Sequence, residues 1–262
     1  MADDGASIQS DLTSLLTDVQ RFLMQEKDLF GNILYPDSST VNPNITGKSV
    51  KPEGIVPAAE SRYPDEPWTA AQSLETLNRQ ICDCMKCPLG ATRTNFVFGV
   101  GNPKAKVVVV GEAPGADEDA KGEPFVGRAG QLLNKILEAI NFKREEVFIC
   151  NILKCRPPNN RDPLPEEVDQ CEPYLWKQLE LLDPLMILAV GRIAGQTLLK
   201  TTRGLGELRN TVHSYHGIPM MVTYHPAALL RNPNWKRPTW EDVQQFRKLY
   251  DERVQQTGEA HG

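Results

Sequence analysis

The sequence predicts an α/β protein, a three-layer α/β/α sandwich with a central, mostly parallel four-stranded sheet. Short apolar runs alternate along the chain with segments of helical periodicity, and this alternation is typical of parallel sheets covered by helices on both faces. The four runs that we expect to form strands are 105–111, 146–153, 184–191 and 218–224.

Helices are expected between and after these strands. In 129–140 the apolar residues recur at the spacing of one helix face. The segment 164–182 has a proline near its start, which suits a first helical turn. Two glutamates follow the proline, and their negative charges are favourable at the positive end of the helix dipole. Two more helices are expected over 191–200 and 240–254.

The first quarter of the chain differs from the rest. Apolar residues at helical spacing predict an amphipathic helix within 1–30, for which the role considered is contact with another protein. Residues 31–67 are rich in Pro, Ser, Asn and charge without periodicity, which indicates a flexible linker. We therefore expect the folded domain at 68–255.

Composition predicts a soluble protein of the cytoplasm. The hydrophobic fraction is 40% and the charged fraction 24%, both ordinary for a globular chain. No apolar run is long enough to cross a bilayer, and the N-terminus has no signal-peptide pattern, so a membrane partner is not expected. We expect a monomer.

Charge is distributed unevenly. The net charge of −5 argues against a nucleic-acid partner, but residues 1–66 alone carry eleven acidic and five basic side chains. The segments 150–161 and 225–237 each hold three basic residues and no acidic one. Such local patches bind phosphates even on an acidic chain.

Six cysteines in a reducing compartment favour metal binding over disulfides. The four candidate ligands are Cys84, Cys87, Cys155 and Cys171. Four thiolates are what zinc or an iron–sulfur cluster requires, and the spacing does not separate the two. Cys82 is close enough in sequence to replace Cys84, whereas Cys150 is expected to be a buried core residue.

Three features lie at carboxyl ends of predicted strands, where parallel sheets bind ligands. The stretch 111–130, GEAPGADEDAKGEPFVGRAG, lacks the GK[ST] of a phosphate-binding loop but lets a ligand approach bare backbone. Its Phe125 is either core or a stacking platform. Asn151 either ties down a loop or reads the edge of a flat heterocycle, and His225 is either an ordinary loop residue or faces a ligand oxygen.

Five motifs together resemble family 4, the iron–sulfur, thermophile-type uracil-DNA glycosylases. They are CMKCPLGATRT (84–94), VFGVGNP (97–103), VGEAPGADEDAKGEPFVGRAGQLL (110–133), NILKCRPPNNRDPLPEE (151–167) and VTYHPAALLRNP (222–233). The resemblance implies an α/β/α sandwich, excision of uracil from DNA and a [4Fe–4S] cluster. It implies that the four candidate cysteines are the cluster ligands.

The resemblance also implies roles at the pocket. Its substrate-binding residues would be Gly111, Ala113, Gly115, Phe125, Asn151 and Asn160. Phe125 would stack on the base and Asn151 would read its edge, while His225 would donate to uracil O2 as negative charge builds there. Wider relatives position water with an Asp where this chain has Ala113. Glu118 and Glu112 are the candidates to replace it, and Glu118 is alternatively a block against thymine.

DNA contacts follow from the same resemblance. Leu229, Leu230 and Arg231 occupy the place of a wedge that enters the duplex during base flipping. The side chains expected to hold phosphates are Lys154, Arg156, Arg161 and Arg231. The alternative is that these four form a solvated basic face.

Two other functions remain possible from the sequence. One is a uracil-DNA binder that traps its product covalently, as a related branch does, although the basic insertion of that branch is missing before His225. The other is an iron–sulfur protein without glycosylase activity.

Overall fold

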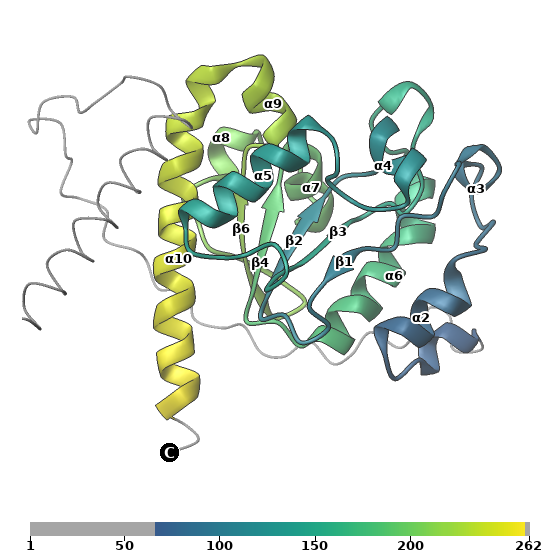
Figure 1. Cartoon of the computed structure of the whole chain (residues 1–262), viewed down its shortest axis with the longest axis horizontal. Helices are drawn as coiled ribbons and strands as arrows, with labels where there is room; N and C mark the ends of the chain where they lie inside the picture. The colour runs from purple at the N-terminus through teal and green to yellow at the C-terminus, as the bar shows by residue number, and fades with distance from the viewer. Residues whose placement is uncertain (1–65, 260–262) are drawn as a thin grey trace, which may run out of the picture. The chain divides into compact units, whose positions relative to one another are not determined.

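The computed structural model describes residues 66–259 (Figure 1). The helix expected within 1–30 lies outside the described residues, as does the linker at 31–67 apart from its last two positions. Within the described part, no helix combines the length and the apolar composition that crossing a membrane requires.

The core of the fold is a sheet whose strand order is β1-β3-β2-β4-β6-β5. Its central strands are β3 (Phe148–Asn151), β2 (Val107–Gly111), β4 (Met186–Val190) and β6 (Ile218–Thr223). These four pair in parallel and correspond to the four predicted apolar runs, which confirms those predictions. Every residue of β2 is buried, as expected for a strand covered on both faces.

The number of strands corrects the expectation of four, because the described sheet has six. The additional strands β1 (Val100–Gly101) and β5 (His213–Tyr215) pair antiparallel at the two edges. They are two and three residues long, too short to show an alternating pattern in sequence. A Cβ at Gly101 would lie 1.9 Å from the Val147 carbonyl oxygen, so only glycine allows β1 to pair here.

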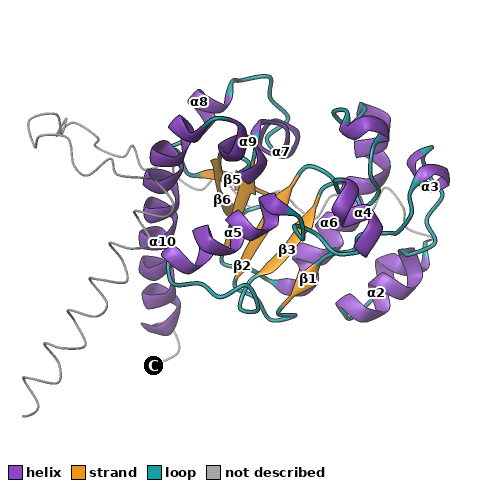
Figure 2. Cartoon of the chain, turned by 45° about the horizontal axis from the view of Figure 1, so that its top comes forward, coloured by secondary structure: helices purple, strands orange, loops and turns teal. Residues whose placement is uncertain are grey.

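Helices cover both faces of the sheet, as the sandwich prediction requires (Figures 1 and 2). The α-helices are α2 (Leu74–Ile81), α3 (Leu89–Thr92), α4 (Ala116–Lys121), α5 (Arg128–Ala139), α6 (Pro165–Leu182), α7 (Arg192–Leu198), α8 (Leu205–Leu208), α9 (Pro226–Arg231) and α10 (Lys236–Glu259). The 3-10 turns are η2 (Pro67–Ala70), η3 (Pro158–Asn160) and η4 (Pro233–Trp235). Helices α5, α6 and α7 confirm three predictions, and α10 extends the fourth at both ends.

Alternate residues of β2 face opposite helical layers. Val108 and Val110 belong to the buried cluster that contains Tyr174 and Leu175 of α6. Val107 and Val109 are equally buried but lie outside this cluster. They face the other side of the sheet, which α5 covers (Figure 2).

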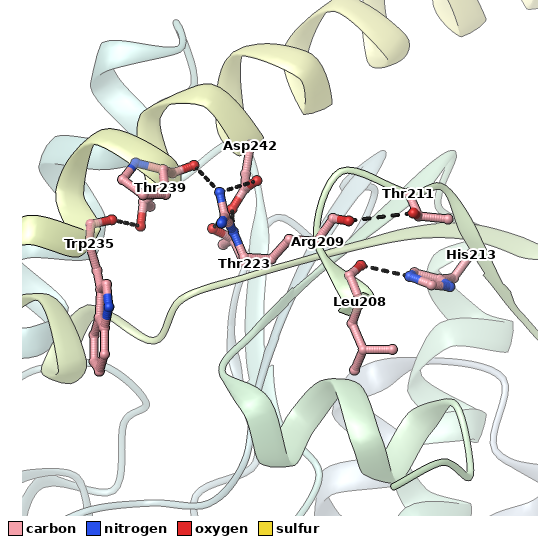
Figure 3. A network of polar contacts seen from close by, with 9 residues as sticks. Leu208, Arg209, Thr211, His213, Thr223, Trp235, Thr239 and Asp242 are labelled. Atoms are coloured by element: carbon pink, nitrogen blue, oxygen red, sulfur yellow. Dashed lines mark hydrogen bonds and ion pairs between the residues drawn. The ribbon is translucent and has the colours of Figure 1, made fainter. Parts of the chain in front are cut away.

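A buried ion pair fixes α10 against the carboxyl end of β6 (Figure 3). Asp242 is 1% exposed and accepts hydrogen bonds from Nε and Nη2 of Arg209, at 2.7 and 2.9 Å. The hydroxyl of Thr223, the last residue of β6, donates to the same carboxylate at 2.6 Å. Because His225 follows Thr223 by two residues, this network also anchors the segment that carries His225.

We expect Asp242→Asn to lower the free energy of unfolding by about 3–5 kcal/mol, since it leaves the Arg209 charge largely buried without its partner. Urea unfolding measures the change. Asp251→Asn is the matched control on the same helix, because the Arg247–Asp251 pair is half-exposed and its loss should cost about 1 kcal/mol or less. Equal losses in the two variants would contradict the assignment.

Candidate active site

The carboxyl ends of β2 and β3 meet at Gly111 and Asn151, which are direct partners in the sheet register. A Cβ at Gly111 would lie 2.3 Å from Asn151 Oδ1 and 2.8 Å from Cζ of Phe125. Only glycine therefore lets the amide and the aromatic ring approach the end of β2 together. The predicted convergence of the GEAPG loop and Asn151 is confirmed.

Phe125 joins this group through an unusual backbone. Its φ of 53° lies in the left-handed region, which non-glycine residues rarely adopt. A Cβ at Gly130 would lie 1.7 Å from the Phe125 carbonyl oxygen, so the first turn of α5 packs directly on this backbone. The Phe125 ring stacks on His225, with centroids 5.4 Å apart and planes 29° from parallel. All three strand-end features thus meet at one place.

Asn151 carries an unsatisfied acceptor. Its side chain is 2% exposed, and Oδ1 is the one fully buried side-chain oxygen or nitrogen without a hydrogen bond in the described part of the chain. Leaving such an atom unpaired costs about 1–3 kcal/mol. A structure that keeps this cost at the end of a strand, beside an aromatic stack, is suited to receive an N–H donor from a ligand.

His225 is arranged as a neutral hydrogen-bond donor. It is the N-cap of α9, where its Nδ1 accepts a hydrogen bond from the Ala227 N–H at 3.1 Å. The proton of a neutral imidazole must then reside on Nε2. Burial, and secondly the charge of Arg231, lower the pKa of His225 to about 4. At neutral pH the ring is therefore uncharged, with one N–H to offer.

Glu118 is occupied as a brace for the Phe125 loop. Its carboxylate accepts hydrogen bonds from the backbone N–H groups of Gly115, Val126 and Gly127, at 3.2, 3.0 and 3.3 Å. The bonds tie the start of α4 to the turn that follows Phe125. This use of both oxygens weakens the case for Glu118 as the residue that positions water, a role that stays a prediction.

Glu112 is a carboxylate with a raised proton affinity. It directly follows Gly111, and burial raises its pKa to about 7, with a further rise from Asp162 and an opposing effect of Arg192. No hydrogen bond to its carboxylate is found within residues 66–259. The neighbouring Ala113 is half-buried and packs against the core. A carboxyl group whose pKa is raised to about 7 suits an acid–base role.

The four candidate cysteines come from three parts of the chain. Cys84 and Cys87 lie between α2 and α3, Cys155 follows β3, and Cys171 lies in α6. The Cys155 thiol is close enough to Cys84 and Cys87 for their charges to interact. The Cys171 thiol is close enough to interact in the same way with Cys84 and Cys155. Within the described residues, no three metal-binding side chains are grouped closely enough for a single ion. A multi-iron cluster bridges a wider span, because each of its thiolates binds a different iron.

Hydrogen-bond donors surround these sulfurs. The Tyr174 hydroxyl donates to Cys84 Sγ at 3.3 Å, Arg93 Nη1 to Cys155 Sγ at 3.4 Å, and the Lys154 N–H to Cys171 Sγ at 3.2 Å. Burial raises the pKa of the Cys171 thiol to about 12, so a thiolate there needs a bound metal. Such donors stabilise the thiolate ligands of iron–sulfur clusters. The donor set therefore fits a cluster.

The two cysteines outside this set differ from it. Cys150 is fully buried in β3, as predicted for a core residue. The Cys82 thiol donates to the Arg79 carbonyl at 3.6 Å. The contact of Tyr174 with Cys84 favours Cys84 over Cys82 as the ligand.

Two of the residues expected to touch DNA are not at the surface. Lys154 is 0% exposed, with its ammonium held inside the protein, so the expectation that it binds a phosphate is wrong for this structure. Leu229 is 2% exposed and belongs to the core, which leaves Leu230, at 41%, as the residue able to act as a wedge.

The remaining expected contacts lie at or near the surface. Arg231 is exposed at the end of α9. Arg156 donates from Nε to Asn160 Oδ1 at 2.8 Å, so the Asn160 side chain is bound within the basic loop. Arg161 forms a bidentate pair with Glu167 and keeps about a third of its side chain exposed. These arginines remain candidates for phosphate contacts.

Sequence reasoning missed the residues that support the site. Arg93 links the carbonyls of Cys82 and Cys84 to Cys155 Sγ, although it stands inside the motif CPLGATRT. Tyr174 and Gly130 lie on the apolar faces of helices, where the sequence pattern predicts ordinary core residues. A polar residue within an apolar stripe, or a glycine within a predicted helix, is the signal that could have identified them.

Comparison with known proteins agrees with this geometry. Residues 98–244 match the family model described as the uracil DNA glycosylase superfamily. A type-4 uracil-DNA glycosylase of Archaeoglobus fulgidus is 45% identical over 186 residues, which cover 68% of this chain and 94% of that protein. Those of Pyrobaculum aerophilum and Thermotoga maritima are 43% and 40% identical, covering 66% and 70% of this chain and 92% and 97% of theirs.

Proposed function

The chain belongs to the type-4 group of the uracil-DNA glycosylase superfamily, and we propose that it excises uracil from DNA by hydrolysing the N-glycosidic bond, leaving an abasic site for repair. The observation that carries this proposal is the unsatisfied Oδ1 of Asn151 beside Phe125. Uracil supplies the missing partner, because its N3–H is a donor and its O4 accepts from the Asn151 amide. Cytosine has the inverse pattern and would leave both groups mismatched.

Base cleavage would be assisted by His225. Phe125 provides a flat apolar surface for the flipped base, and its stack on the imidazole places His225 at the edge of the same pocket. The Nε2–H would donate to uracil O2 as the C1′–N1 bond breaks and negative charge moves onto the base. A neutral donor fixed by its N-cap bond to Ala227 needs no rearrangement for this step.

We propose that a [4Fe–4S] cluster is held by Cys84, Cys87, Cys155 and Cys171. Bound there, the cluster would act as a structural brace that crosslinks the segment before α3, the loop after β3 and α6. Asn151 lies four residues before Cys155, so the brace would also support the base-reading end of β3. The exposed Leu230 and the arginines at 156, 161 and 231 would contact the duplex around this pocket.

Wild-type protein should release uracil from a uracil-containing oligonucleotide, so that alkali then breaks the strand at that position. We expect Asn151→Ala and His225→Ala each to lower kcat/KM by about a hundredfold or more, since each removes a hydrogen bond to the reacting base. His216→Ala is the control, because His216 lies in the turn between β5 and β6 at the opposite end of the sheet. An alkali-stable product from wild-type protein would refute the function.

Glu112 should produce a pH dependence. With a pKa of about 7, its carboxylate is protonated below neutral pH and ionised above it, so kcat/KM should rise as pH increases through 7 if the anion positions water. Glu112→Gln should flatten this rise and hold the rate near the low-pH level of wild type. An unchanged ascending limb in the variant would assign the titration to another group.

Cys155→Ser should lower the iron bound per chain and the visible absorption, and weaken binding to DNA through loss of order in the loop after β3. Cys82→Ser is the matched control, since the Cys82 thiol donates to the Arg79 carbonyl, whereas the Tyr174 hydroxyl donates to Cys84. Iron content and DNA affinity equal to wild type in Cys155→Ser would exclude it as a ligand.

A further inference from the structure

Lys154 is a buried cation that the proposed reaction does not use. It is 0% exposed, and no ion pair with a carboxylate is found for it among residues 66–259. Burying an ammonium group is costly unless its protons are bound by good acceptors. Its position between Asn151 and Cys155 in the sequence raises the question of what this cation holds in place.

The contacts of Lys154 join the cysteine site to the end of β3. Its backbone N–H donates to Cys171 Sγ at 3.2 Å. Its Nζ donates to the main-chain oxygen of Asn151 at 2.7 Å and to Gln178 Oε1 at 2.6 Å. Gln178, in α6, in turn donates to the Phe98 carbonyl at 2.9 Å. One side chain thus connects α6 with the residue that faces the base.

The bond to Asn151 lies on the side of β3 where, within the described sheet, no strand pairs with Asn151. Strand β1 pairs with β3 only at Phe148 and Ile149, so it ends before Asn151. The Ile152 N–H donates to Gly111 on the β2 side, and neighbouring residues of a strand direct their backbone groups to opposite sides. The Asn151 carbonyl therefore points to the side that β1 has left open, and the Lys154 ammonium occupies it.

We propose that Lys154 is a positioning residue, whose ammonium replaces the missing strand partner and thereby fixes the backbone from which the Asn151 amide faces the base. The inference rests on the proposed role of Asn151. It predicts that Lys154 affects the excision rate only while the Asn151 side chain is present. A general contribution of Lys154 to folding would affect the rate with or without that side chain.

The test is a double-mutant cycle on uracil excision. Lys154→Met keeps the length of the side chain and removes its donors, and we expect kcat to fall by about tenfold to a hundredfold, as small misplacements of reacting groups do. In an Asn151→Ala background the same change should cost less than about twofold, because the group that Lys154 positions is already gone.

Lys177→Met is the matched control, since Lys177 is a second, largely buried lysine nearby in α6 that pairs with Glu180. Lys154→Gln, which keeps an N–H donor on a shorter chain, should give an intermediate rate and replaces the Met variant in the cycle if that variant does not fold. Wild-type kcat in Lys154→Met, or an equal loss in both backgrounds, would overturn the inference. Absence of excision by wild-type protein would instead refute the proposed function.

Discussion

The missing side chain at Gly111 is the constraint on which the site depends. At the end of β2 the backbone must admit both the Asn151 amide and the Phe125 ring, and any Cβ would lie within 3 Å of each. The tight approach explains why a strand of four valines ends in a glycine. The backbone of Phe125 is left-handed where the chain turns into α5, a strained conformation kept at the site.

The side chains at the strand ends differ in charge from those of the loops that follow them. The pocket offers an amide and an uncharged imidazole, with a carboxyl that titrates near neutral pH at its edge. Groups of this kind are suited to recognise an uncharged base by its hydrogen-bond donors and acceptors. An uncharged N–H donor also stabilises negative charge that develops on the bound group during a reaction. The arginines lie in the loop after β3 and at the end of α9, so the acidic chain carries local basic patches there.

The central strands and long helices were predictable because their apolar periodicity is carried by the sequence itself, as in 107–111 and 165–182. The edge strands were not, since β5 pairs only through its hairpin with β6 and has no apolar pattern. The meeting of Gly111, Asn151 and His225 followed from the rule that parallel strands end at one edge. Lys154 was misplaced because a lysine in a basic loop predicts solvent exposure, and nothing local shows that buried acceptors surround its ammonium.

Lys154 and Glu118 support the two walls of the pocket in corresponding ways. Each is a charged side chain that binds backbone groups rather than an opposite charge: Glu118 accepts three N–H groups around the Phe125 turn, while Lys154 donates to the Asn151 carbonyl. Hydrogen bonds to charged groups are the stronger kind, and here they hold the backbone at the end of β3 and around the turn between α4 and α5. The segment around Phe125 and the end of β3 are therefore held by different side chains, and Lys154 links the end of β3 to Gln178 of α6.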